Sequence, residues 1–135
     1  MSRKILLVED NDLNMRLLRD ILEARGHVVL CASGVEDARK CFAEASIDLV
    51  LMDIQIVGGR GEDLLREIRA VRRFDGVPVI AVTAYAMDGD RARFLSLGFD
   101  EYVSKPIDTR AIGPLVDRYL ARTVRPPYEL DGVER

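Results

Sequence analysis

Apolar residues are distributed along this chain in two alternating patterns. Short continuous apolar runs are typical of strands buried on both faces of a sheet, and they predict strands at 4–8, 28–31, 49–53, 79–82 and 101–103. Between these runs, apolar residues recur every three or four positions, which is the spacing of one helix face. This spacing predicts helices after residue 12 up to Gly26, at about 35–45, 62–72 and 88–97, and from 108 or 109 onward.

The alternation of strands and helices predicts an α/β fold. Because the connections are short, we expect a five-stranded parallel sheet with five helices on both of its faces. The economical strand order is 2-1-3-4-5, the order of flavodoxin-like (βα)5 folds, and it places a switch point between the first and third strands. A chain of 135 residues fits one domain, expected over 1–122. Residues 123–135 carry two prolines and no periodicity, so a mobile tail is expected there.

Individual positions lead to further structural expectations. The buried face of the first helix is expected to comprise Leu13, Leu17, Leu18, Ile21 and Leu22. That of the last helix is expected to comprise Ile112, Leu115, Val116, Tyr119 and Leu120. Ser33 is the expected N-cap of the second helix. Glycines at 58, 59 and 61 predict a loop with unusual backbone freedom.

Composition excludes several classes of protein. A formal net charge of −3 argues against a protein that binds nucleic acid through the phosphate backbone, and the arginines between 60 and 73 are interpreted as a solvated surface balanced by neighbouring acids. The first apolar run is too short for a signal peptide or a membrane span, so we expect a cytoplasmic protein without a membrane partner. Cys31 and Cys41 are expected to be reduced and half-buried.

Polar side chains follow four of the predicted strands, and they are Glu9 with Asp10, Asp53, Thr83 and Lys105. The carboxyl ends of parallel strands meet at one edge of the sheet, so these groups are expected to share one crevice. Three carboxylates in one place repel each other unless a cation joins them. Mg2+ prefers oxygen ligands, which makes Glu9, Asp10 and Asp53 candidate metal ligands. The backbone carbonyl of Gln55 is a candidate for one more ligand oxygen.

Two roles are open to Asp53 beside a metal ion, that of a passive ligand and that of a nucleophile toward phosphorus. Lys105 and Thr83 favour the second role, because an ammonium and a hydroxyl together can hold two oxygens of a phosphoryl group. In-line phosphoryl transfer is catalysed mainly by such positioning and electrostatics. The product of this reaction is an aspartyl phosphate.

These motifs, in this order, resemble the signature of response-regulator receiver domains in two-component signalling. The resemblance covers about residues 3–122 and rests on Glu9-Asp10-Asn11, Met52-Asp53, Thr83-Ala84 and Lys105-Pro106. Longer runs at 8–15, 52–55, 82–87 and 104–107 are similar to those of a single-domain cell-cycle regulator in that family. The resemblance therefore implies a single-domain response regulator of a phosphorelay.

The resemblance also implies roles for individual residues. Asp53 is expected to accept phosphate, in a Mg2+-dependent reaction, from a histidine kinase or a histidine phosphotransferase. The peptide bond before Pro106 is expected to be cis, and Tyr102 is expected to turn inward when Thr83 moves toward the phosphate. The phosphorylated form is expected to bind a protein partner through the face made by the fourth helix, the fifth strand and the fifth helix. Such a protein is not an enzyme in the usual sense, since it catalyses only its own phosphorylation and slow dephosphorylation.

One position departs from the family pattern. Many receivers have proline four residues after the phosphorylated aspartate, whereas this chain has Val57. A more mobile loop after Asp53, and a looser presentation of the Gln55 carbonyl, are therefore expected.

Other functions fit the sequence less well. A phosphatase of the haloacid-dehalogenase type needs a second aspartate two residues after the nucleophile, and Gln55 cannot transfer a proton. A flavin or nucleotide binder needs a phosphate-binding loop after the first strand, where Glu9 and Asp10 repel phosphate. His27 follows Gly26 at a strand entry and is interpreted as a surface turn residue. The phosphoryl donor is therefore expected to be another molecule.

Overall fold

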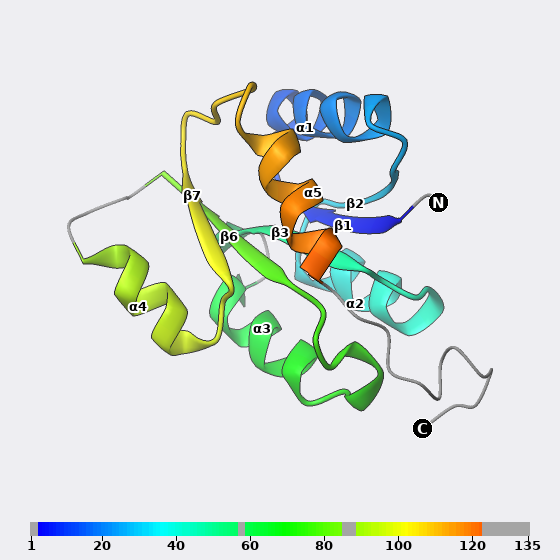
Figure 1. The fold of residues 1–135 in the computed structure, drawn as a ribbon. Helices are drawn as coiled ribbons and strands as arrows, with labels where there is room; N and C mark the ends of the chain where they lie inside the picture. The colour runs from blue at the N-terminus through cyan, green and yellow to red at the C-terminus, as the bar shows by residue number, and fades with distance from the viewer. Residues whose placement is uncertain (1–2, 57–58, 85–88, 123–135) are drawn as a thin grey trace.

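A computed structural model describes residues 3–56, 59–84 and 89–122 of the chain. Within these residues, one sheet contains five strands in the order β2-β1-β3-β6-β7, and all its neighbouring strands are parallel (Figure 1). The strands are β1 (Lys4–Val8), β2 (Val28–Ala32), β3 (Leu49–Asp53), β6 (Val79–Thr83) and β7 (Glu101–Ser104). The predicted α/β class, the parallel sheet and the strand order are confirmed.

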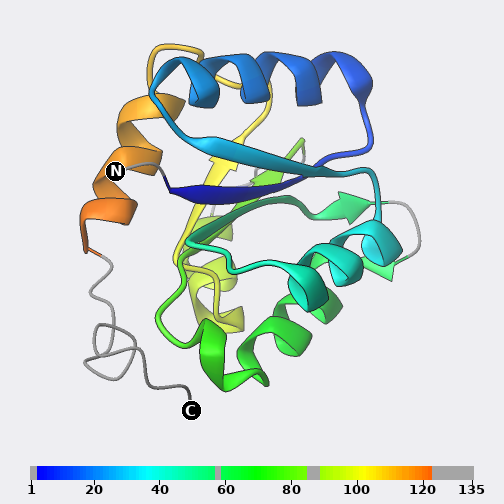
Figure 2. The same ribbon diagram turned by 90° about the vertical axis from the view of Figure 1, so that its right-hand side faces the viewer.

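Helices cover both faces of the sheet (Figures 1 and 2). On one face, α1 (Asp12–Ala24) and α5 (Ile112–Arg122) pack against alternate strand residues such as Ile5 and Leu51. On the other face, α2 (Val35–Glu44), α3 (Gly61–Arg69) and α4 (Asp90–Leu97) pack against residues such as Leu6 and Met52. None of the described helices is long and apolar enough to cross a membrane.

The central strand β3 is buried along its whole length, as its continuous apolar run predicts. Its register with β1 pairs Val8 with Met52, so the two strands end together. Farther along the sheet, β6 and β7 pair as far as Thr83 and Ser104. The carboxyl ends of β1, β3, β6 and β7 therefore lie at one edge, and this is where the candidate site is found.

The segment after Asp53 differs from the expected loop. It contains a short antiparallel pair, β4 (Gln55–Ile56) with β5 (Gly59–Arg60), in which Gln55 lies opposite Arg60 and Ile56 opposite Gly59. Val57 and Gly58 lie outside the described residues. The glycine-rich composition favours irregular backbone, but Gly59 takes part in a strand pairing, opposite Ile56.

The N-terminus of α2 is capped differently from the prediction. Gly34, not Ser33, occupies the N-cap position. The hydroxyl of Ser33 instead donates a hydrogen bond of 2.8 Å to Asp37 Oδ2. Serine one residue outside the cap therefore still satisfies a polar group of the first turn.

Two further helices have other limits than expected. Helix α3 ends at Arg69 and is followed by a 3-10 turn at Arg72–Phe74. Helix α5 begins at Ile112 and not at 108 or 109, because the Asp108 carboxylate accepts the backbone N–H of Arg110 and closes a turn before the helix. Helix α4 is described from Asp90 onward, and the expected start at residue 88 lies outside the described residues, as does the expected mobile tail 123–135.

The predicted buried face of α1 is wrong for two leucines. Leu18 and Leu22 are buried, but Leu13 is 76% exposed and Leu17 is 41% exposed. Each residue turns an α-helix by about 100°, so the line through Leu13 and Leu17 lies beside the line that faces the sheet. The spacing of the apolar residues in the sequence does not show which of these two lines of α1 faces the sheet. On α5, Ile112, Val116 and Leu120 are buried as expected, while Leu115 and Tyr119 are partly buried.

His27 is not the surface turn residue that was expected. Its side chain is only 10% exposed, and its Nε2 lies 2.7 Å from Asp117 Oδ1 on α5. Arg25 Nε donates to the other oxygen of Asp117 over 2.7 Å. The pairing joins the turn between α1 and β2 to α5. The interpretation of Cys31 and Cys41 as free, partly buried thiols is confirmed.

Candidate functional site

Three carboxylates gather at the carboxyl ends of β1 and β3. Glu9, Asp10 and Asp53 each offer an oxygen within 4.8 Å of the others. Glu9 and Asp53 are buried, whereas Asp10 is exposed, so the cluster has one side open to solvent. A donor set of carboxylate oxygens with an open side suits Mg2+, which keeps several of its water ligands. The residues present therefore fit the expected metal ion.

Lys105 joins this cluster from the segment that follows β7. Its Nζ donates to Asp53 Oδ2 over 2.6 Å and to Glu9 Oε1 over 3.1 Å. The backbone N–H of Lys105 continues the sheet by donating to Thr83 O over 2.8 Å. The peptide bond between Lys105 and Pro106 is cis, as the resemblance implies. One ammonium therefore contacts two buried carboxylates from strands that are distant in the sequence.

The electrostatics of the cluster follow from this arrangement. Burial raises the pKa of Glu9 to about 7. The adjacent Asp53 carboxylate also raises this pKa, whereas the hydrogen bond from Lys105 lowers it. For Lys105, partial burial lowers the pKa, but the hydrogen bonds to Asp53 and Glu9 outweigh it and raise the pKa overall. Repulsion between the acids is thus relieved partly by the lysine and partly by proton uptake on Glu9.

A pH dependence of stability follows for the protein in EDTA. The pKa of Glu9 is raised from 4.5 to about 7, so its contribution to folding is present below pH 4.5 and is lost as the pH rises through 7. This carboxyl group therefore lowers the free energy of unfolding by up to about 3 kcal/mol between acid and neutral pH. Glu9→Gln removes that loss and is expected to be the more stable protein at pH 8. Urea unfolding at pH 5 and pH 8 measures both values.

The control for this prediction is Glu44→Gln, which alters an exposed acid at the end of α2. It should keep the wild-type difference between the two pH values. Equal pH dependence in wild type and Glu9→Gln would contradict the assignment of the raised pKa to Glu9.

Thr83 and Gln55 are the two other residues that the sequence analysis assigned to the site. Thr83 ends β6 and is 4% exposed. The backbone N–H of Gln55 donates to Asp53 Oδ1 over 3.0 Å. Both oxygens of Asp53 therefore have a defined donor, Lys105 on one side and the Gln55 backbone on the other.

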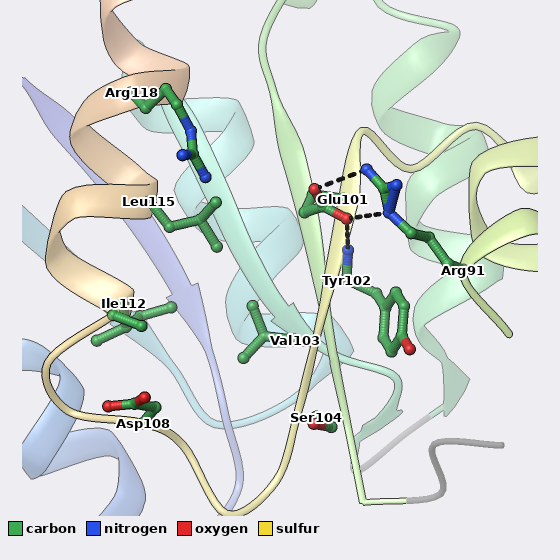
Figure 3. A pocket seen from close by; sticks show the side chains of 10 residues that line it. Arg91, Glu101, Tyr102, Val103, Ser104, Asp108, Ile112, Leu115 and Arg118 are labelled. Atoms are coloured by element: carbon green, nitrogen blue, oxygen red, sulfur yellow. Dashed lines mark hydrogen bonds and ion pairs between the residues drawn. The ribbon is translucent and has the colours of Figure 1, made fainter. Parts of the chain in front are cut away.

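Tyr102 is half-buried in β7, on the side of the sheet that faces α4. Its ring centroid lies 5.6 Å from that of Phe94, with the two planes tilted by 37°. It also contributes to a cavity of about 430 Å³ between α4, β7 and α5 (Figure 3). Glu101 lies in this cavity and accepts hydrogen bonds from Arg91 of α4 and from the backbone N–H of Tyr102 (Figure 3). The carboxylate of Glu101 thus connects α4 to the strand that carries Tyr102.

Sequence reasoning did not find this role of Glu101. Its partners come from α4, from its own strand and from α5, where the Tyr119 hydroxyl lies 3.2 Å from Glu101 Oε2. The partners on α4 and α5 are too far apart in the sequence for a motif to indicate that they meet at Glu101. The only available signal was an acid at the start of a predicted edge strand, which is also common at plain surfaces.

A parallel sheet of this order, with an acid cluster and a lysine at its carboxyl edge, is the arrangement that the sequence resemblance implies for a receiver domain. The family model described as the response regulator receiver domain matches residues 5–117. The chain therefore belongs to the response regulator receiver domain family, a class of two-component signalling proteins.

The single-domain regulator that the longer motifs resemble is DivK, and this likeness is confirmed. The polar-differentiation response regulator DivK of Brucella ovis is 37% identical over 120 residues, which are 89% of this chain and 98% of that protein. The DivK protein of Brucella anthropi matches to the same extent, with 37% identity over 120 residues.

Solved structures of receiver domains resemble the fold closely. The receiver domain of the sensor histidine kinase PA1611 from Pseudomonas aeruginosa has a TM-score of 0.79 and 31% identity, over 90% of this chain and 99% of that chain. That structure holds a magnesium ion in its active site cleft. The non-phosphorylated HemR receiver domain from Leptospira biflexa has a TM-score of 0.82 and 28% identity, over 94% of this chain and 100% of that chain. Membership of this family implies magnesium binding at an acidic site and interaction with histidine kinases or phosphotransferases.

Proposed function

We propose that this protein accepts a phosphoryl group on Asp53 from a phosphohistidine and thereby changes its affinity for a protein partner. The observation that carries the proposal is the position of the Lys105 ammonium, 2.6 Å from Asp53 Oδ2 and 3.1 Å from Glu9 Oε1. A nucleophilic carboxylate, a cation that can move to phosphate oxygens and an acidic metal-binding group thus lie in contact.

The transfer forms one bond and breaks one bond. An oxygen of Asp53 attacks phosphorus, and the bond from phosphorus to the donor histidine nitrogen breaks, with its electron pair returning to the imidazole ring. Lys105 leaves Asp53 and pairs with an oxygen of the transferred group, while the hydroxyl of Thr83 donates to another. Glu9, Asp10, Asp53 and the Gln55 carbonyl are the proposed ligands of Mg2+, which supplies charge neutralisation for the phosphoryl oxygens.

The proposed output is a shift between two conformations of the same domain, residues 1–122. Phosphate on Asp53 draws Thr83 toward it and Tyr102 inward, which changes the face formed by α4, β7 and α5. An almost complete shift requires phosphate to prefer the active conformation by about 5.5 kcal/mol. The protein acts in the cytoplasm, where reduced Cys31 and Cys41 are stable. Gln55 cannot transfer a proton, so hydrolysis of the phosphorylated form is slow.

The test of this function uses small-molecule phosphodonors and needs no cognate kinase. Wild-type protein is incubated with acetyl phosphate, with Mg2+ or with EDTA, and its mass is followed. The mass of one phosphoryl group should appear with Mg2+ and be lost almost entirely in EDTA. Beryllofluoride should shift the NMR signals of Tyr102 under the same conditions. Labelling that proceeds equally in EDTA would contradict the proposal.

The exposed leucines of α1 lead to a prediction about the donor. Asp53 is buried, so a protein that delivers a phosphohistidine must cover the rim of the site. Leu13 lies in the first turn of α1, three residues after Asp10. Leu13→Ser is expected to slow transfer from a histidine phosphotransferase by about tenfold, the effect of losing a contact of roughly 1.4 kcal/mol. Labelling by acetyl phosphate should stay unchanged.

The control is Leu97→Ser, which makes the same exchange at an exposed leucine in the last turn of α4. Both variants are compared with wild type, using a phosphotransferase that labels the wild-type chain. If Leu13→Ser and Leu97→Ser accept phosphate from it at the wild-type rate, α1 does not contact the donor.

A further inference from the structure

The β4–β5 pair leaves the polar groups of Gln55 on a defined side. Gly61 N–H donates to Ile54 O over 2.9 Å, and Gln55 lies opposite Arg60 one position farther along. Antiparallel strands alternate between bonded and non-bonded opposite residues. Gln55 is therefore in a non-bonded pair, and its N–H and C=O both point away from β5. In agreement with this, the Gln55 N–H reaches Asp53 Oδ1 over 3.0 Å.

Gly61 is where the returning chain lies against the strand end that carries Asp53. A Cβ atom at position 61 would lie 3.0 Å from Ile54 Cα, 3.1 Å from Met52 Sδ and 3.3 Å from Asp53 O. Two of these three atoms belong to backbone at the end of a buried central strand, which cannot yield cheaply. Any side chain at position 61 therefore pushes on the peptide units between Asp53 and Gln55.

We propose that Gly61 is a positioning residue for the cation and phosphoryl site. Its missing side chain lets β5 pack on the backbone of Ile54, and the β4–β5 pair then fixes the Gln55 N–H on Asp53 Oδ1. The Gln55 carbonyl, on the same side of β4, is thereby directed toward the carboxylates. The pairing supplies the rigidity that many receivers obtain from a proline at the position of Val57. This inference rests on the proposed function, because it assigns the rigidity to that same site.

The test measures Mg2+ affinity of the unphosphorylated protein by calorimetry, and then the rate of labelling by acetyl phosphate at saturating Mg2+. Gly61→Ala is expected to weaken Mg2+ binding by about tenfold, the low end of the effect of disturbing groups that orient metal ligands. By the same alternation, Ile56 and Gly59 are a bonded pair. Gly59→Pro removes the N–H of position 59 from this pair and should weaken Mg2+ binding similarly. It adds nothing beside Asp53, so it tests the pairing independently and decides the matter if Gly61→Ala does not fold.

Two controls separate positioning from general loss of stability. Gly59→Ala keeps the N–H, and its Cβ would meet only a methyl group of Val35, at 3.2 Å. Val116→Ala opens a cavity in the opposite half of the core, on α5. Both should retain wild-type Mg2+ affinity, the second despite a lower unfolding temperature.

The outcomes distinguish this inference from the proposed function. Wild-type protein that binds no Mg2+ and takes no label overturns both. Normal labelling of wild type, with unchanged Mg2+ affinity in both Gly61→Ala and Gly59→Pro, overturns the positioning role alone. The positioning role is also overturned if Val116→Ala weakens Mg2+ binding as much as Gly61→Ala and Gly59→Pro do. Weakened binding in the first two variants only, with normal binding in the two controls, supports it.

Discussion

Replacing Asp53 with asparagine is expected to abolish phosphorylation of the protein by acetyl phosphate and by protein donors. The amide has no oxygen with the nucleophilicity of a carboxylate, so no acyl phosphate can form. The fold should remain, because the asparagine Oδ1 can still accept the Gln55 N–H and because Lys105 keeps its contact with Glu9. Mass spectrometry of the intact variant after labelling measures the loss, and circular dichroism measures the fold.

Asp63→Asn is the matched control for Asp53→Asn. Asp63 is an exposed acid in the first turn of α3, and its partner is Arg66 of the same helix. This variant should be labelled like wild type. Full labelling of Asp53→Asn at another carboxylate would show that the arrangement around Lys105 does not select the nucleophile.

Lys105→Arg is expected to uncouple the phosphoryl group at Asp53 from the movement of Tyr102. The ammonium acts as a point charge between two buried carboxylates, at 2.6 and 3.1 Å, whereas a guanidinium is planar, larger and forked. It cannot occupy this place and then follow the phosphoryl oxygens. The shift of the Tyr102 NMR signals on addition of beryllofluoride should fall from almost complete to a small fraction of that in wild type.

The control for Lys105→Arg is the same exchange at Lys4, which is exposed at the start of β1. Lys4→Arg should respond to beryllofluoride like wild type. A full Tyr102 response in Lys105→Arg would show that charge alone, without the shape of the ammonium, is sufficient at this position.

The sequence predicted the sheet because burial on both faces leaves a direct mark on composition. Strand β3 is apolar at every position before Asp53, which is typical of a central strand of a parallel sheet. The gathering of Glu9, Asp53 and Lys105 followed from the same argument, since each of them comes at or just after the end of a parallel strand. The distances between them confirm this geometric expectation.

The features that the sequence did not predict leave no clear pattern of apolar and polar residues in the chain. The pairing of β4 with β5 involves only two residues on each side, too few for a periodic pattern. The burial of His27 depends on Asp117, which is ninety residues away. The exposure of Leu13 depends on which line of α1 faces the sheet, and a single helix pattern with five apolar residues leaves two lines open.

The central claim is that Asp53 carries the phosphoryl group. Its most direct measurement is borohydride reduction of protein labelled with acetyl phosphate and Mg2+, followed by tandem mass spectrometry of the peptides. Borohydride reduces an acyl phosphate to an alcohol, so residue 53 should be found as homoserine, and unlabelled protein should retain aspartate there. Homoserine at Asp10 or at another acid, or a label that resists borohydride as a serine or threonine ester does, would contradict the account.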